Sequence, residues 1–262
     1  MRQLPLELDR AQVLETARAQ GMRLDNKRVL IGLSESEPAP MVLDCEDRPH
    51  LLVFADFSCG KTTLLRNIAQ GIVENPSPND ARVIMVDYCR TMLGAIDGPH
   101  LAGYSTSGQT SVPTREEAAR FVSQRMPGAD ITPTQLRERS RWTGPEVYVI
   151  VDDYDMMASN NPLLPLIDLL PQARDICLHV VSARRADGAS RALYVNALGL
   201  LEDMSIDGIL MRTPRTRVCC SVTCARAVSA GPGHAGVTPA WARARPDLSA
   251  ARPVIRSDRK GL

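Results

Sequence analysis

The 262-residue chain lacks a hydrophobic run long enough to cross a membrane. A spanning helix needs about 20 consecutive apolar residues, and no segment approaches that length. The first ten residues, MRQLPLELDR, contain no apolar core, so they do not predict a signal peptide. The seven cysteines are odd in number and show no disulfide-like spacing, which is typical of a reducing compartment. We therefore expect a cytoplasmic protein.

Standard zinc-site spacing is also missing. Cys219, Cys220 and Cys224 precede His234, but these intervals match no structural zinc motif. We therefore do not predict a zinc site. Internal repeats and coiled-coil heptads are absent as well.

Net charge is almost absent, at +1, but it is unevenly distributed. Residues 212–262 hold ten Lys or Arg and two acidic residues, for a net charge of +8, whereas residues 1–211 carry −7. From Arg212 onward the helical and alternating periodicity also stops. A basic tail is typical of nucleic-acid-binding segments, and this is one interpretation of the region.

Before the tail, apolar runs of strand length alternate with helical patterns. We predict strands within RVLIGLSE, PMVLDC, HLLVFAD, RVIMVDY, EVYVIVDDYD, LHVVSARR and DGILM. Helices are predicted for residues 8–21, 63–74, 114–126, 163–175 and 191–204. Residues 94–113 are predicted to form a loop, with Thr114 and Glu117 making a capping box at the start of the next helix. Because the strands are continuously apolar, we predict an α/β fold with a mostly parallel sheet covered by helices on both faces.

Residues 54–66, FADFSCGKTTLLR, join a predicted strand to a predicted helix. In that context a loop ending Gly60-Lys61-Thr62 predicts a phosphate-binding loop. Backbone N–H groups and the helix N-terminus would attract the phosphates, Lys61 would bridge the β- and γ-phosphates, and Thr62 would bind Mg²⁺. The alternative is a chance Gly-Lys-Thr turn. The predicted nucleotide-binding positions are Ala55, Ser58, Cys59, Gly60, Lys61, Thr62 and Thr63.

Ala55 stands where the phosphate-loop pattern has its first glycine. If that position required a positive φ, alanine would cost about 1 kcal/mol of strain. The phosphate-contacting positions are all present, so we expect ATP binding to survive this substitution.

Two acids end the strand EVYVIVDD. Asp152 would hold the water shell of Mg²⁺, and Asp153 occupies the position of the acid that polarises the attacking water in related ATPases. That acid is usually glutamate, and Asp153 is one methylene shorter. Since a general base needs hydrogen-bond reach to its water, we expect slow hydrolysis. The alternative is a pair of surface acids at a strand end.

Arg184 and Arg185 end the strand LHVVSARR, on the side of the sheet where ligands bind in such folds. We predict that one of them, Arg184 in particular, senses the γ-phosphate or reaches a neighbouring subunit's nucleotide. Ser182 is a weaker candidate for a polar sensor. The alternative is a solvated pair of surface charges.

Several segments together carry a family resemblance. KRVLIGLSESEPAPMVLD, RPHLLVFAD, SCGKTTLLR, VIMVDY, VIVDDYDMM and LHVVSARRADGASRALY resemble the C-terminal ATPase module of EccC, the FtsK/SpoIIIE-type ATPase of ESX (type VII) secretion systems. The match covers residues 2–211 nearly continuously. It implies a RecA-like P-loop NTPase fold, ATP and Mg²⁺ as cofactors, and the roles of Lys61, Thr62, Asp152 and Asp153 given above.

The resemblance also implies partners and a location. EccC-like proteins carry several such modules in tandem, so we expect other ATPase modules of the secretion complex as partners and a ring oligomer in the full assembly. The family handles secreted helical protein pairs, which implies docking of their C-terminal signals at the inner face of the cell membrane. We interpret this chain, which holds one module, as an excised domain or a truncated reading frame.

The resemblance ends after Met211, where the family continues with an acidic, glycine-containing segment. GC-rich codons for residues 212–224, read two nucleotides on, permit DPEDEGVLLGDVR, which fits that expectation. A frameshift would explain the basic charge and the lost periodicity together, and we favour it over a DNA-binding tail. We divide the chain into an N-terminal helix and approach hairpin (1–50), a P-loop ATPase core (51–211) and an atypical basic tail (212–262) that does not pack on the sheet.

Three functions are compatible with these motifs. The favoured one is an ATP-Mg²⁺-binding module with slow or no hydrolysis that docks export signals. A DNA-translocating FtsK-type ATPase is the alternative, but the acidic body disfavours a DNA channel, and we expect no nucleic acid partner. A small-molecule kinase is disfavoured by the acid pair on a separate strand and by the approach hairpin.

Overall fold

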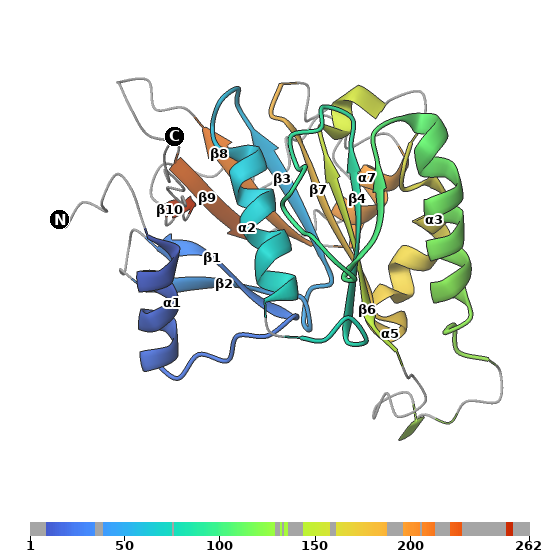
Figure 1. Ribbon diagram of the computed structural model, residues 1–262, viewed down its shortest axis with the longest axis horizontal. Helices are drawn as coiled ribbons and strands as arrows, with labels where there is room; N and C mark the ends of the chain where they lie inside the picture. Colours follow the sequence, from blue (N-terminus) through green and yellow to red (C-terminus); the bar gives the residue numbers. More distant parts are fainter. Residues whose placement is uncertain are drawn as a thin grey trace, which may run out of the picture.

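The computed structural model describes residues 9–34, 39–74, 76–128, 132, 134–135, 144–157, 161–187, 196–204, 206–212, 221–226 and 250–253. Within these ranges the chain forms a twisted central sheet with helices on both faces (Figure 1). The predicted α/β fold class is thereby confirmed.

The N-terminal part is a helix followed by a hairpin. Asp9 caps helix α1 (Arg10–Ala19) by accepting a hydrogen bond from the Ala11 amide. Strands β1 (Arg28–Ser34) and β2 (Pro40–Asp44) then pair antiparallel. Both elements were predicted from the sequence.

Most of the remaining elements alternate between strand and helix as the apolar pattern predicts, although β5 follows β4 directly and β8, β9 and β10 are consecutive. The first group is β3 (His50–Ala55), α2 (Lys61–Val73), β4 (Ala81–Asp87), β5 (Leu101–Ser105), α3 (Gly108–Ser123) and β6 (Glu146–Asp152). The second is the 3-10 helices η1 (Tyr154–Met157) and η2 (Leu164–Gln172), then α5 (Ala173–Ile176), β7 (Leu178–Arg185), α7 (Asn196–Asp203), β8 (Asp207–Arg212), β9 (Ser221–Arg226) and β10 (Ala250–Pro253).

The strands form one sheet in the order β2-β1-β10-β9-β8-β3-β7-β6-β4-β5. The pairs from β8 to β5 are all parallel, so the carboxyl ends of these strands meet at one edge. The pairs from β2 to β8 are antiparallel. Ligands of such sheets bind at the carboxyl edge of the parallel strands, where β3 leads into the candidate phosphate loop.

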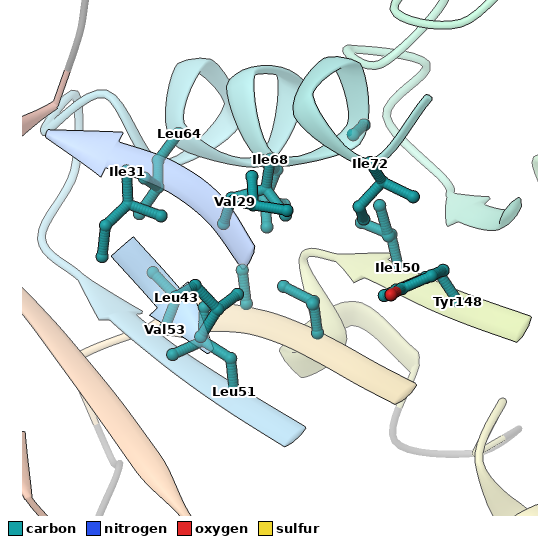
Figure 2. Close-up of a cluster of buried hydrophobic side chains, with 14 of the residues drawn as sticks. Val29, Ile31, Leu43, Leu51, Val53, Leu64, Ile68, Ile72, Tyr148 and Ile150 are labelled. Carbon is teal, nitrogen blue, oxygen red and sulfur yellow. The ribbon is translucent and has the colours of Figure 1, made fainter. Parts of the chain in front are cut away.

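Each face of the sheet has its own core. Side chains of β3 alternate between them: Leu51 and Val53 pack on the α2 side, whereas Leu52 and Phe54 pack on the side of α3, η2, α5 and α7. Figure 2 shows the first core, in which hairpin residues Val29, Ile31 and Leu43 meet α2 residues Leu64, Ile68 and Ile72. The approach hairpin therefore shares a core with the phosphate-loop helix, and each buried aliphatic side chain contributes about 1.5–3 kcal/mol.

Two expectations about secondary structure are wrong. Strand β5 and the first turns of α3 lie within 94–113, which was predicted to be a loop. Helix α3 begins at Gly108 with Ser107 as its N-cap, and Ser107 and Thr110 form the capping box, so Thr114 lies inside the helix. The Ser, Thr and Gly content that suggested a loop here supplies a helix cap.

The expectation that residues 212–262 do not pack on the sheet is wrong for two segments. Residues 221–226 pair antiparallel with β8, and residues 250–253 join them to β1. Backbone hydrogen bonds make this pairing, so it does not require the apolar periodicity whose loss suggested an unpacked tail. Cys219, Cys220 and His234 lie outside the described residues. No helix within the described ranges is long and apolar enough to span a membrane.

A buried ionic cluster ties the N-terminal part to the amino ends of β6 and β7. The Glu146 carboxylate lies 2.8 Å from Lys27 Nζ and 2.7 Å from His179 Nε2. The His179 ring stacks on Tyr148, whose hydroxyl donates to the Asn26 carbonyl at 2.6 Å. Burial alone would raise the pKa of Glu146, but the His179 hydrogen bond and the Lys27 ion pair outweigh it and lower this pKa to about 2.

We expect the free energy of unfolding of Glu146→Gln to depend less on pH in the acid range than that of wild type. A lowered folded-state pKa stabilises the fold above pH 4.5, the ordinary pKa of a glutamate, and this contribution is lost as pH falls toward about 2. Wild type should therefore lose about 3 kcal/mol more than the variant over that interval in urea unfolding at stepped pH. The exposed control Glu116→Gln should keep the wild-type steepness; parallel curves for wild type and Glu146→Gln would contradict the assignment.

Candidate nucleotide-binding site

The loop between β3 and α2 has the backbone shape of an anion-binding turn. Ser58 and Gly60 both have positive φ, at 59° and 81°. Gly60 is the N-cap of α2 and makes no side-chain capping bond, while its carbonyl accepts from the Leu64 amide at 2.9 Å. The first-turn amides of α2 are therefore available to a phosphate, and the helix dipole favours an anion there.

Ala55 causes no backbone strain at this site. It is the last residue of β3, is 1% exposed and is not among the residues with positive φ. Its strand neighbours are Arg185 and Met211. The condition under which alanine would cost free energy does not arise, because a strand residue here needs no left-handed conformation.

The two predicted acids meet the phosphate loop. Asp152 is the last residue of β6 and is 0% exposed. Its Oδ1 lies 2.5 Å from Lys61 Nζ, and its Oδ2 accepts from the Thr62 hydroxyl at 2.8 Å. Lys61 also contacts the Asp153 carboxylate. Residues predicted separately from two motifs, about 90 positions apart, thus form one cluster.

Lys61 and Asp153 keep their charges in this cluster. Burial alone would lower the pKa of Lys61, but the contacts with Asp152 and Asp153 outweigh it and raise this pKa. For Asp153 burial opposes ionisation most strongly, yet the hydrogen bond and charge of Lys61, together with Cys89 and Arg185, outweigh it and lower the pKa of the carboxyl. A charged ammonium and carboxylates at the N-terminus of α2 are the groups that hold a nucleotide phosphate and its metal.

The donor set fits Mg²⁺. The Thr62 hydroxyl and the Asp152 carboxylate are hard oxygen donors held next to each other, and Mg²⁺ binds through few protein oxygens while keeping several waters. No group of three or more His, Cys, Asp or Glu side chains that could hold a metal ion occurs in the described part of the chain.

The other predicted loop positions differ in placement. Cys59 is 1% exposed and packs in the α2-side core, so only its backbone can face a phosphate. Ser58 is exposed, and Thr63 lies half-buried in the first turn of α2. The sequence pattern does not show whether backbone or side-chain atoms at these positions would contact a phosphate.

The two arginines at the end of β7 are not equivalent. Arg184 Nε donates to the Arg185 carbonyl at 3.2 Å, and burial lowers the pKa of the Arg184 guanidinium. The Arg185 amide donates to Asp155 Oδ1 at 3.1 Å, and the Arg185 charge helps to lower the pKa of Asp153. Arg185 is therefore coupled to the acid pair, while the sensor role of Arg184 stays a prediction. The buried Ser182 hydroxyl has no hydrogen-bond partner among the described residues.

Two residues of the site, Asp87 and Thr91, escaped sequence reasoning. Asp87 ends β4 directly beside Asp152 and is 1% exposed. It accepts from the Tyr104 hydroxyl and the Met92 amide, both at 2.6 Å. Thr91 lies between Asp87 and Asp152. The signal was present, because RVIMVDY is an apolar strand ending in an acid, as is EVYVIVDD.

Comparisons with known proteins find relatives among ESX secretion system proteins. No protein-family model matches the chain. EccC of Thermomonospora curvata is 42% identical over 212 residues, which are 80% of this chain and 16% of that protein. The ESX-4 secretion system protein EccC4 of Mycobacterium tuberculosis is 41% identical over 185 residues, 70% of this chain and 15% of that protein. The chain thus spans about a sixth of the length of these relatives.

Solved structures of the same kind of protein share the fold. The cytoplasmic domain of T. curvata EccC superposes with a TM-score of 0.79 at 34% identity, covering 97% of this chain and 28% of that one. T. curvata EccC (ATPases 2 and 3) in complex with a signal sequence peptide gives a TM-score of 0.80 at 34% identity, covering 97% of this chain and 44% of that one.

Proposed function

Because the chain belongs to the EccC family of ESX secretion ATPases, we propose that it is an ATP-Mg²⁺-binding module that hydrolyses ATP slowly and docks export signals. The observation that carries the nucleotide part is the Thr62–Asp152 hydrogen bond beside Lys61. It joins a phosphate loop to an acidic strand end, the combination that ATP binding by P-loop proteins requires.

Each residue of the cluster has a role in nucleotide binding. The amides at the start of α2 and the Lys61 ammonium bind the phosphates, and Thr62 and Asp152 hold Mg²⁺, directly or through water. When bound, Mg²⁺ neutralises developing charge on the phosphate oxygens. Asp153 is the acid placed to orient water, but its carboxylate contacts Lys61 and is one methylene shorter than glutamate. Slow turnover follows from that short reach.

A groove beside α3 is suited to the export signal. It has a volume of about 570 Å³, and its apolar lining includes Ile84, Ala102, Ala118, Phe121 and Val147. Phe121 is 41% exposed although it is large and apolar. Amphipathic helices bind such grooves with one apolar face, and the T. curvata EccC structure is a complex with a signal sequence peptide.

The signal-docking proposal is tested by titrating the chain with a labelled C-terminal peptide of an ESX-type substrate. We expect saturable binding, and Phe121→Glu should weaken it by about fivefold or more, since a buried aromatic anchor contributes over 1 kcal/mol. The control Leu164→Glu changes an apolar side chain that is 59% exposed outside the groove, and it should bind as wild type. Equal loss in both variants would remove the groove from the proposal.

Duplex DNA at physiological salt is the competing ligand in the same assay. The acidic body disfavours the phosphate backbone, so we expect no saturable binding. Saturable DNA binding without peptide binding at millimolar concentration would favour the DNA-translocase function instead. We further propose that the module works in the cytoplasm, at the inner face of the membrane, with other ATPase modules of the secretion complex in a ring.

A further inference from the structure

We propose that Thr91 is a positioning residue for Asp152, and that it sets how strongly Mg²⁺ enhances ATP binding. The inference rests on the proposed nucleotide function and extends it to residues of the β4–β5 connection. Its basis is the Thr91 hydroxyl, which lies between the Asp152 carboxylate of the site and the Asp87 carboxylate behind it.

The carboxylate behind the site is Asp87. It is 1% exposed and lies beside Asp152 in the parallel β4–β6 pair. Its Oδ2 accepts from the Tyr104 hydroxyl and the Met92 amide, each at 2.6 Å. Two short bonds to one oxygen fix the carboxylate and the turn that follows β4.

Thr91 connects this carboxylate to the site. Its hydroxyl lies 3.1 Å from Asp152 Oδ2 and 3.3 Å from Asp87 Oδ1. A hydroxyl carries one proton, so it donates to one carboxylate at a time. Asp87 keeps its bonds from Tyr104 and Met92 when Thr91 donates to Asp152, and this makes Asp152 the acceptor that needs the proton.

The Thr91 backbone is held by the helix that begins with the phosphate-binding residues. Arg66 Nε and Nη2 donate to the Thr91 carbonyl at 2.9 and 2.7 Å, and Nη2 also donates to the Leu93 carbonyl at 2.9 Å. Arg66 lies one turn after Thr62 on α2. A series of contacts therefore runs from Thr62 through Asp152 and Thr91 to Arg66, and it begins and ends on α2.

The importance of Thr91 increases when nucleotide binds. Asp152 is held by Lys61, Thr62, Thr91 and the Asp153 amide, which donates to Oδ1 at 2.8 Å. Lys61 and Thr62 are the residues assigned to phosphate and metal. Of the described side chains, Thr91 then remains to orient Oδ2. Partners that orient a metal ligand in this way commonly affect metal affinity.

The test compares ATP affinity with Mg²⁺ and with EDTA by calorimetry. In Thr91→Val, which keeps the side-chain shape, the Mg²⁺-dependent gain in affinity should fall by about tenfold, while affinity in EDTA stays within about twofold of wild type. Thr91→Ser restores the hydroxyl and should recover the gain. Thr16→Val makes the same change in helix α1, where the Thr16 hydroxyl donates to the Gln12 carbonyl, and should keep the gain.

The outcomes separate this inference from the proposed function. If Thr91→Val keeps the wild-type gain in ATP affinity from Mg²⁺, the positioning role of Thr91 is overturned and the proposed function is not. An equal loss in Thr91→Val and Thr91→Ser, with lowered melting temperatures, overturns it in favour of a fold requirement of the turn. A wild-type chain that binds ATP no better with Mg²⁺ than with EDTA overturns the proposed function, and the inference with it.

Discussion

Lys61→Ala is expected to bind ATP more than about tenfold more weakly than wild type, a loss of at least about 1.4 kcal/mol. The substitution removes the ammonium that we propose binds the β- and γ-phosphates, and it leaves the loop backbone intact. Isothermal calorimetry in Mg²⁺ measures the effect. Lys27→Ala, which removes a lysine from the remote Glu146 ion pair, is the matched control and should retain wild-type affinity. Equal affinities for Lys61→Ala and wild type would refute the site.

The same substitution has a second expected effect in the absence of nucleotide. Lys61 is paired with Asp152, which is fully buried, and with Asp153. Removing one partner of a buried ion pair leaves an uncompensated charge, which typically costs about 3–5 kcal/mol. Binding should therefore be compared at a temperature well below the melting point of the variant, so that a folding defect is not mistaken for a lost phosphate contact.

The sheet was predictable because its strands are continuously apolar and its helices are periodic. These signals depend on burial on both faces, which is what the structure shows for β3 and β6. They are missing for β5, which has one fully buried residue at the sheet edge, and for β9, whose pairing depends on backbone bonds. An edge strand such as β5 needs little burial, so its composition resembles that of a loop.

The candidate site was predictable where one motif specifies both the conformation of the loop backbone and the side chains beside it. Gly60-Lys61-Thr62 does so, and the acids at 152 and 153 complete it. Asp87 and Thr91 were not predictable as site residues, because their role depends on the order of strands: β4 lies next to β6, and this places two strand-ending acids side by side. Sequence alone shows two such acids without showing that the strands are neighbours.

The position of Asp153 bears directly on turnover. Its φ of 50° turns the chain sharply after β6, and its carboxylate contacts Lys61 instead of reaching past it. Cys89 also hydrogen-bonds to this carboxylate and helps to lower its pKa. The acid is therefore charged and held against Lys61, which is consistent with the slow hydrolysis that we propose. Nucleotide that binds only the folded state stabilises it by mass action.

The isolated chain is accordingly expected to hydrolyse ATP at less than about 1 s⁻¹, below the usual range for enzymes. Asp153→Glu extends the carboxylate by one methylene, so it can reach water while Lys61 engages phosphate. We expect turnover to rise by about tenfold or more, the lower part of the effect of a positioned general base, with ATP affinity unchanged.

Steady-state phosphate release measures this effect, and Asp155→Glu is the matched control, because it lengthens an acid that contacts Arg185 and not Lys61. Unchanged turnover in Asp153→Glu, with normal ATP binding, would show that acid length does not limit the reaction. The limit would then be an arginine supplied by a neighbouring module, since such residues accelerate P-loop hydrolysis by about 10³–10⁵-fold. Turnover well above 1 s⁻¹ in the wild-type chain alone would contradict both explanations, because in that experiment the chain has the short acid and no neighbouring module.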